Sequence, residues 1–177
     1  MKYVAFLRAL NVGGNRVVKM DRLRALFEDL GYSGVATFIA SGNVLFTSAS
    51  ADAAALEARI ERHLAKALGF EVATFVRTGD ELAAIARHDP FTLASSTEKT
   101  TLMIAFLRSA PSKAARERVM SLRTATDDLH VRGRELYWLL RSNFSQSTVS
   151  GSALERALGP ATMRSVTTVR KLAARCE

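Results

Sequence analysis

The chain has 177 residues, of which 48% are apolar and 24% charged, and its formal net charge is +8 with a single cysteine. This mix is typical of a globular protein and excludes an intrinsically disordered chain. One cysteine excludes an internal disulfide and a multi-cysteine metal site. Because no uncharged apolar run approaches the roughly 20 residues of a membrane span, we expect a cytoplasmic protein with no membrane segment.

Residues 1–78 predict one α+β unit. An apolar, β-branched run ends at turn-forming residues after Leu10, helical spacing of Leu and Phe follows, and glycines end both predicted helices. The order strand, helix, strand, strand, helix, strand is the ferredoxin-like arrangement. The predicted elements are a strand at 3–10, a helix from Asp21 to Leu30, strands at 35–40 and 44–47, a helix at 52–68 and a strand at 72–77.

Residues 79–99 predict a short helix and a polar linker, and residues 100–177 predict a second, related unit. Its order, strand, helix, two strands and two helices, is a truncated version of the first and ends in helices. Ala5-Phe6-Leu7-Arg8 recurs as Ala105-Phe106-Leu107-Arg108, which indicates an internal repeat. The predicted elements are a strand at 101–107, a helix at 111–122, strands at 129–132 and 135–140, and helices at 152–158 and 165–174.

No catalytic machinery is visible in the sequence. His63, His88 and His130 have no spacing that places two ligands on one helix face or one strand, so neither a metal site nor a cofactor is predicted. The chain lacks a Gly-x-Ser-x-Gly motif, and no base lies near Cys176 in sequence. The catalytic residues are therefore unknown, and the sequence leaves open whether the protein is an enzyme.

The loop after the first strand is the strongest candidate for a binding site. Residues 1–24 contain six basic residues and one acidic residue, a net charge of +5. Adjacent glycines free backbone N–H groups to face an anion, although the spacings of the nucleotide P-loop and the dinucleotide fingerprint are absent. A wide turn with capping side chains explains the same residues. The candidate ligand residues are Arg8, Asn11, Gly13, Gly14, Asn15 and Lys19.

Two further segments supply candidate ligand residues. Ser41, Gly42 and Asn43 form a predicted hairpin turn whose polar groups would lie beside the first loop. Near the C-terminus, the spacing of four and three residues predicts one helix face with two cations and a hydroxyl group, although an amphipathic tail explains the pattern equally. The residues of this segment are Thr162, Arg164, Thr168 and Lys171.

These residues also resemble a bacterial family, the domain of unknown function 1697. The resemblance spans nearly the whole chain and implies an α+β fold of two ferredoxin-like units, with no established activity. This chain departs from the usual family pattern at Ser165-Val166-Thr167, where the family has Asn-Trp-Asn, and at Ser147-Thr148, where it has Ser-Lys. The matching motifs are Arg8-Ala9-Leu10-Asn11-Val12-Gly13-Gly14, Lys19-Met20, Leu23, Ser41-Gly42-Asn43-Val44, Leu154-Glu155-Arg156-Ala157-Leu158-Gly159 and Thr162, Arg164, Thr168, Lys171 and Leu172.

Three functions follow from the sequence. The first is a binding module for an anionic ligand, either nucleic acid or a nucleotide or polyphosphate, at the glycine loop. The second is an enzyme that acts on a small phosphorylated or carboxylated metabolite at the same loop. The third is a protein-interaction scaffold. The possible partners are therefore nucleic acid or a phosphorylated small molecule, and the oligomeric state stays open.

Overall fold

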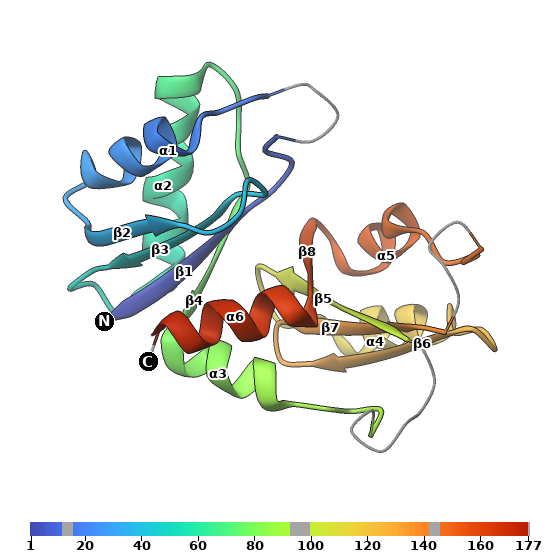
Figure 1. Ribbon diagram of the computed structural model, residues 1–177. Coiled ribbons are helices and arrows are strands. Elements are labelled where there is room, and N and C mark those ends of the chain that lie inside the picture. The colour runs from blue at the N-terminus through green and yellow to red at the C-terminus, as the bar shows by residue number, and fades with distance from the viewer. Residues whose placement is uncertain (12–15, 93–99, 142–145, 177) are drawn as a thin grey trace. The chain divides into compact units, whose positions relative to one another are not determined.

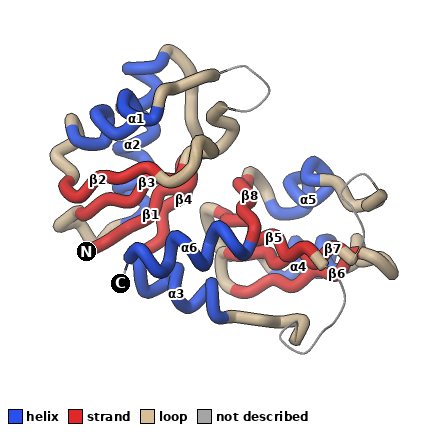
Figure 2. Tube along the Cα trace, viewed as in Figure 1, coloured by secondary structure: helices blue, strands red, loops and turns tan. Residues whose placement is uncertain are grey.

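The computed structural model describes residues 1–11, 16–92, 100–141 and 146–176 (Figure 1). The described chain is a mixed α+β protein with two four-stranded antiparallel sheets and six helices (Figure 2). It divides into two compact units: residues 1–84 together with the segment from Lys171 onward, and residues 85–170. Within the described residues, no helix is long and apolar enough to cross a membrane.

The first unit has the element order that the sequence predicts. Its sheet has the strand order β2-β3-β1-β4, so β1 is central and pairs antiparallel with β3 and β4. Asp52 caps the second helix by accepting a hydrogen bond from the Ala55 N–H, and Gly69 ends that helix in a left-handed conformation. The elements are β1 (Lys2–Leu7), α1 (Met20–Glu28), β2 (Ser33–Thr37), β3 (Asn43–Thr47), α2 (Ala53–Leu68) and β4 (Thr74–Thr78).

The core of the first unit lies between its sheet and the helices α1 and α2, which cover one face of that sheet in Figure 1. Alternate residues of β1 point into it, and Tyr3, Ala5 and Leu7 are all buried there. Tyr3 stacks on Phe46 with ring centroids 5.4 Å apart. The alternation fixes the register of β1, because a shift by one residue would exchange these side chains with those of the opposite face.

The segment from Lys171 onward packs with the first unit, which no sequence pattern predicted. The Arg175 guanidinium lies 4.7 Å from the centre of the Phe38 ring. A Cβ atom on Gly79 would stand 3.0 Å from that of Cys176. The last described residues of the chain therefore lie against the first unit, beside Phe38 and the start of α3 (Gly79–Arg87).

The second unit contains a fourth strand, so the expectation that it is truncated is wrong, although the chain ends in a helix as expected. A strand at Ala161–Ser165 pairs antiparallel with β5 and completes a sheet in the order β6-β7-β5-β8. This strand has five residues and passes directly into a helix without a turn residue. Its short alternating pattern therefore cannot be distinguished in the sequence from the helical spacing that follows. The remaining elements of the chain are α3 (Gly79–Arg87), β5 (Thr101–Leu107), α4 (Lys113–Met120), β6 (Asp127–Arg132), β7 (Glu135–Leu140), α5 (Gly151–Leu158), β8 (Ala161–Ser165) and α6 (Val166–Cys176). Of these, α3 and α6 each contribute residues to both units.

Candidate functional site

The predicted ligand residues of the first unit lie at the carboxyl end of β1 and at the start of α1. Arg8 directly follows β1 and is half-buried. Lys19 is exposed and occupies the N-cap position of α1, where its side chain makes no capping hydrogen bond. Gly13, Gly14 and Asn15 lie outside the described residues.

Asn11 ties together three backbone segments of the first unit. Its Nδ2 donates to the carbonyl oxygens of Val18, at 3.1 Å, and Ala40, at 2.9 Å. Its Oδ1 accepts from the Val18 N–H at 2.7 Å. The side chain therefore joins the two ends of the loop after β1 to the turn before β3, and its amide is used in positioning these segments.

The turn of Ser41, Gly42 and Asn43 lies against the end of β1, as the sequence suggests. The Leu7 N–H donates to the Gly42 carbonyl at 2.8 Å, and Gly42 has a φ of +75°. A Cβ on Gly42 would stand 3.0 Å from that of Leu7, so the approach requires glycine. Asn43 is fully buried and donates to Phe38 O and Ser41 Oγ, both at 3.0 Å.

This end of the first unit combines cations with exposed apolar side chains. Arg16 and Lys19 are exposed, and the Arg16 guanidinium lies 5.3 Å from the centre of the Phe70 ring. Between them Val17 is 70% exposed, and Ile39, beside the Ala40 carbonyl that Asn11 holds, is 53% exposed. The side-chain amide of Asn11 therefore joins the segments that carry these cations and apolar side chains.

The backbone at this end is also strained. Residues other than glycine adopt a positive φ here at Ala9 (57°), Asn11 (56°), Arg16 (55°) and Ile39 (50°). Asn tolerates this conformation, but a β-branched residue such as Ile39 rarely adopts it. Strain of this kind clusters at functional sites, where it costs about 1–3 kcal/mol per residue.

The C-terminal candidates do not form the predicted helix face. Arg164 belongs to β8 and α6 begins only at Val166, so Arg164, Thr168 and Lys171 do not share a helical period. Arg164 Nη1 donates to Thr162 Oγ1 at 2.9 Å and to the Met163 carbonyl at 2.7 Å, and burial lowers the pKa of Arg164 to about 10. Thr168 lies at the start of α6, where its N–H donates to Ser165 Oγ. Lys171 is exposed and opens the segment that packs with the first unit.

Two histidines that are far apart in sequence meet in the second unit. The ring centroids of His88 and His130 are 5.4 Å apart, and Tyr137 lies 5.0 Å from His88. Burial lowers the pKa of His88, Arg132 and His130 act in the same direction, and Asp89 opposes them. This shift favours the neutral imidazole of His88, whose Nε2 is buried without a hydrogen-bond partner among the described residues.

The sequence predicts only part of this cluster of His88, His130 and Tyr137. His130 and Tyr137 are cross-strand neighbours that the hairpin at Gly133 predicts, but the approach of His88 depends on how the chain after α3 packs. In the part of the chain that the structure describes, no three side chains of the metal-ligating types His, Cys, Asp and Glu gather as a metal site would require.

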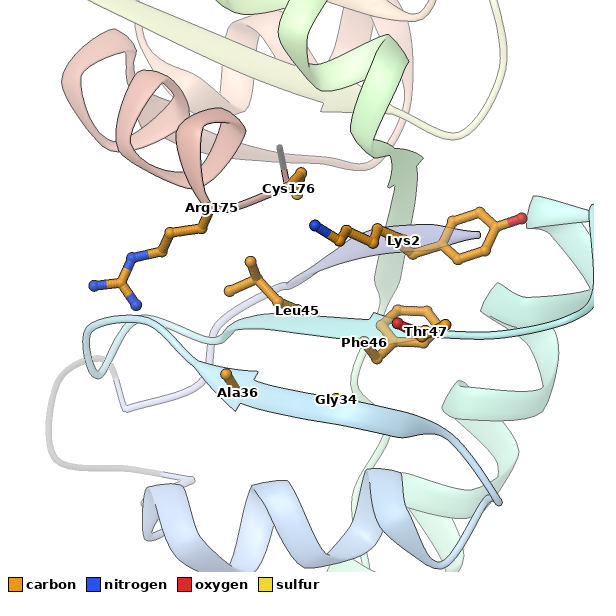
Figure 3. Close-up of a pocket in the computed structure, with 9 residues that line it drawn as sticks. Lys2, Gly34, Ala36, Leu45, Phe46, Thr47, Arg175 and Cys176 are labelled. Atoms are coloured by element: carbon orange, nitrogen blue, oxygen red, sulfur yellow. The ribbon is translucent and has the colours of Figure 1, made fainter.

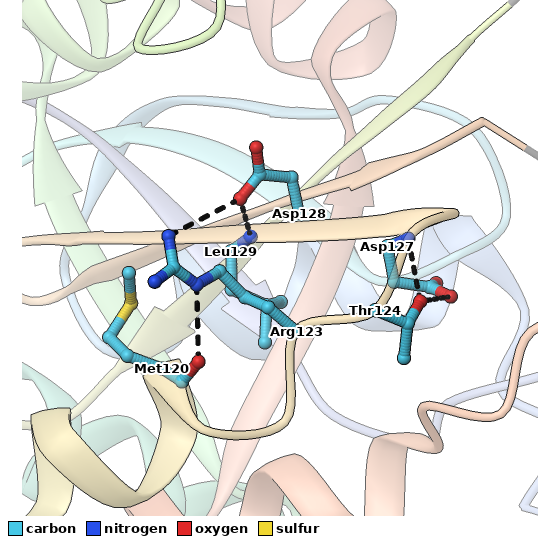
Figure 4. Close-up of polar contacts among 6 residues, drawn as sticks. All are labelled: Met120, Arg123, Thr124, Asp127, Asp128 and Leu129. Atoms are coloured by element: carbon cyan, nitrogen blue, oxygen red, sulfur yellow. Dashed lines mark hydrogen bonds and ion pairs between the residues drawn. The ribbon is translucent and has the colours of Figure 1, made fainter.

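Asp127 is a fully buried carboxylate of the second unit, and Figure 4 shows its contacts with Thr124. Its carboxylate accepts from Trp138 Nε1 at 2.9 Å and Ser147 Oγ at 2.6 Å, and also from the hydroxyls of Thr124 and Thr126. Burial by itself raises the pKa of Asp127, but these hydrogen bonds outweigh it and hold the pKa below its usual value. The carboxylate is already well supplied with donors, which indicates a structural role.

Comparison with known proteins gives a family and a fold. A model of the family described as "Protein of unknown function (DUF1697)" matches residues 1–137. No curated protein matches the chain. Among solved structures, the conserved bacterial protein SP0830 from Streptococcus pneumoniae is similar, with a TM-score of 0.78 and 23% sequence identity over 99% of this chain and 98% of that one.

Proposed function

We propose that this chain, which belongs to the DUF1697 family of proteins of unknown function, binds a nucleoside phosphate through the segments that Asn11 joins in the first unit. The ligand is either a free nucleotide or a stretch of nucleic acid, because both present phosphates beside a planar base. Exposed apolar side chains next to exposed cations carry this proposal. Val17 lies between Arg16 and Lys19, and Ile39 lies on the adjoining turn.

The charges favour an anion at this end. Arg8, Arg16 and Lys19 all belong to a region with a net charge of +5, and Lys19 stands where a helix dipole disfavours a cation. Lys19 weakens the start of the helix, and binding of its ammonium group to a phosphate would explain why a lysine is present there. Neutralising phosphates with Lys and Arg releases counterions, so binding through these residues weakens as salt rises.

The apolar side chains favour a nucleoside over a bare phosphate. Val17 and Ile39 are two of the three large apolar residues that are well exposed in the described chain; the third is Met1. Apolar side chains that stand beside a phosphate site can pack on the face of a base. Ile39 exposes its apolar side chain on the turn although its positive φ is costly for a β-branched residue.

The proposal also includes the finer fold of the two units. Strand orders β2-β3-β1-β4 and β6-β7-β5-β8, with two helices between strands in each unit, support a ferredoxin-like arrangement. In such a unit the carboxyl end of the first strand and the turn before the third strand lie at one edge, where we place the ligand. A cytoplasmic bacterial protein would meet nucleotides and RNA in its own compartment.

Fluorescence anisotropy tests the proposal with three probes: a labelled single-stranded oligonucleotide, a labelled adenine nucleotide, and unlabelled tripolyphosphate as a competitor. We expect at least one nucleoside phosphate to bind at about 50 mM salt and to weaken by tenfold or more at about 200 mM. If the oligonucleotide alone binds, the site takes nucleic acid; if the free nucleotide binds as well, it takes the nucleotide unit.

Two double variants and one single variant distinguish a defined binding site from an effect of net charge. Replacing Arg16 and Lys19 together by Gln should weaken binding about tenfold or more. Replacing Arg62 and Lys66 by Gln removes the same charge from exposed positions on α2 and should have little effect. Ile39→Asn should weaken nucleotide binding but not competition by tripolyphosphate. Equal losses in both double variants, or no binding by any probe at low salt, would overturn the proposal.

A further inference from the structure

A second candidate binding site is a pocket on the first unit, made by β1, β2, β3 and the last residues of α6 (Figure 3). Its volume is about 360 Å³, within the range of roughly 300–1,000 Å³ of small-molecule sites. It shares no lining residue with the nucleoside phosphate site proposed above. The described residues that line it are Lys2, Tyr3, Gly34, Ala36, Leu45, Phe46, Thr47, Arg175 and Cys176.

The hollow exists because the edge strand β2 contributes little bulk. Its lining residues are Gly34 and Ala36, and Ala36 pairs with Leu45 of β3. The register of β2 shifts between Ser33 and Ala36, and Gly34 adopts a φ of +60° there. Leu45 is 9% exposed and forms an apolar surface that the small residues of β2 leave open.

The charged residues that line the pocket are both basic. The ammonium of Lys2 and the guanidinium of Arg175 both belong to lining residues, whereas none of the described lining residues is acidic. Stacking on Phe38 holds the Arg175 guanidinium in place, so less side-chain entropy is lost when it meets a ligand. Figure 3 shows Lys2 extended toward Cys176, on the side of the pocket where Arg175 lies.

We propose that this pocket binds a small amphipathic anion, with its carboxylate, sulfonate or phosphate group at Lys2 and Arg175 and its apolar body on Leu45 and Ala36. Charge complementarity selects the head group, and the small residues of β2 leave room for a body of about the size of a naphthalene ring system. A pocket that is apolar at its floor and cationic at its rim discriminates against neutral compounds of the same shape, which lack the charged hydrogen bonds.

Two fluorescent probes test this site. 8-Anilinonaphthalene-1-sulfonate carries an apolar body and an anionic group, and N-phenyl-1-naphthylamine carries nearly the same body without the charge. We expect the sulfonate to bind with one-to-one stoichiometry and about tenfold or more tightly than the amine. Equal affinity of the two probes would remove the role of Lys2 and Arg175.

Variants of the lining residues test whether the probes bind in this pocket. Replacing Lys2 and Arg175 together by Gln should weaken the sulfonate about tenfold and leave the amine unchanged, while the matched Arg62 and Lys66 double variant should change neither. Ala36→Phe fills the hollow from an exposed position and should abolish binding of both probes. Far-UV circular dichroism establishes that each variant is folded. Persistent sulfonate binding in folded Ala36→Phe protein would overturn the proposal.

Alkylation of Cys176, the only cysteine, gives an independent readout. Burial raises the pKa of its thiol and Lys2 partly opposes this, so its reaction with iodoacetamide is slow and can be followed by mass spectrometry. Bound sulfonate should slow the reaction in the wild type and have no effect in Ala36→Phe. An unchanged rate in the wild type at saturating probe would place the probe elsewhere and contradict the proposed site.

Discussion

The two units contain the same four-residue segment at the same place in the sheet, but the chain leaves that segment in different ways. Phe6 pairs with Asn43 and Phe75, and Phe106 pairs with Glu135 and Thr162, each in a central strand between two antiparallel neighbours. After β5 the chain reaches α4 within a few residues, and Ser112 caps that helix. The connection from β1 to α1 has more than twice as many residues, and α1 has no side-chain cap.

The two units differ in how many non-glycine residues adopt an energetically costly positive φ at these places. Among the described residues, four of the five non-glycine positions with positive φ lie in the loop after β1 or in the adjoining turn; the fifth is Thr92. The corresponding hairpin of the second unit uses Gly133 at its positive φ and meets no such cost. The first unit therefore keeps strained, cationic and exposed side chains at a place where the second shows that a shorter, relaxed connection suffices.

The largest effect is expected in the second unit, whose stability depends on one carboxylate. Asp127→Ala removes the hydrogen bonds that the carboxylate accepts from Trp138 and from the Ser147, Thr124 and Thr126 hydroxyls, and a hydrogen bond to a charged group contributes about 1.5–3 kcal/mol. The buried Trp138 N–H loses this acceptor, whereas the Ser147 hydroxyl can still donate to the Val149 carbonyl, which is 3.0 Å away. We expect a decrease of about 4 kcal/mol in the free energy of unfolding, measured by urea denaturation. Trp138 is the only tryptophan, so its fluorescence follows this unit directly.

The neighbouring Asp128→Ala is the control, because Asp128 is partly exposed; its carboxylate lies 3.9 Å from Arg123 Nη1 and accepts from the adjacent Leu129 N–H at 3.0 Å (Figure 4). This variant should change stability by less than about 1 kcal/mol. The pH dependence supplies a second check. Since the pKa of Asp127 is lowered on folding, its contribution is present above its unfolded pKa of 3.8 and is lost as the pH falls below that value. The difference between wild type and Asp127→Asn should therefore shrink below about pH 4.

The second expected effect is at the close approach between β1 and the turn before β3. Gly42→Ala adds strain at a φ of +75° and a contact of 3.0 Å with Leu7, and should lower stability by about 2–3 kcal/mol. Gly31 has a similar φ of +79° but nothing within 4 Å of an added Cβ, so Gly31→Ala should cost only about 1 kcal/mol. Circular dichroism during urea denaturation measures both. Equal losses would show that backbone conformation alone requires glycine at residue 42.

A smaller effect is expected at the cap that only the second unit has at this place. Ser112 Oγ accepts from the Ala115 N–H at 3.2 Å. Ser112→Ala should lower the free energy of unfolding by about 1 kcal/mol, because one N–H at the start of α4 loses its acceptor. The exposed Ser109 precedes it in the same connection, and Ser109→Ala should stay within about 0.5 kcal/mol of the wild type in the same measurement.

Local sequence patterns predicted most of the individual elements, because each has its own period and its own ending. The two positive-φ glycines after the helices of the first unit, Gly31 and Gly69, mark their ends as expected, and the turn at Ser41, Gly42 and Asn43 joins two paired strands. The family assignment from the loop and turn motifs is confirmed by the family model.

The rest depends on tertiary packing, which no local pattern contains. β8 passes into α6 without a break. The position of Arg164 in the sequence therefore fitted a helical spacing, although the residue lies in a strand. His88 and His130 are 42 positions apart, and only the packing of the second unit brings their rings together. The position of Arg175 over Phe38, which helps to form the pocket, likewise joins two distant parts of the sequence.

The smallest expected effect addresses Lys19 at the start of α1. The residue has the extended conformation of an N-cap, with φ −63° and ψ 139°, but a lysine cannot accept a hydrogen bond from the helix. Lys19→Ser supplies the acceptor that Ser112 supplies in the second unit, and should raise the free energy of unfolding by about 0.5–1 kcal/mol. Urea denaturation followed by circular dichroism measures this gain.

Lys19→Gln completes the comparison, because it removes the charge without providing a good cap. If Lys19 meets a ligand phosphate, both variants should weaken nucleoside phosphate binding to the same extent, and only Lys19→Ser should be more stable than the wild type. The lysine would then lower the stability of α1 in exchange for affinity. A Lys19→Ser protein that gains stability and binds as tightly as the wild type would make Lys19 an ordinary surface cation, and the difference between the two units would have to lie in the strained residues alone.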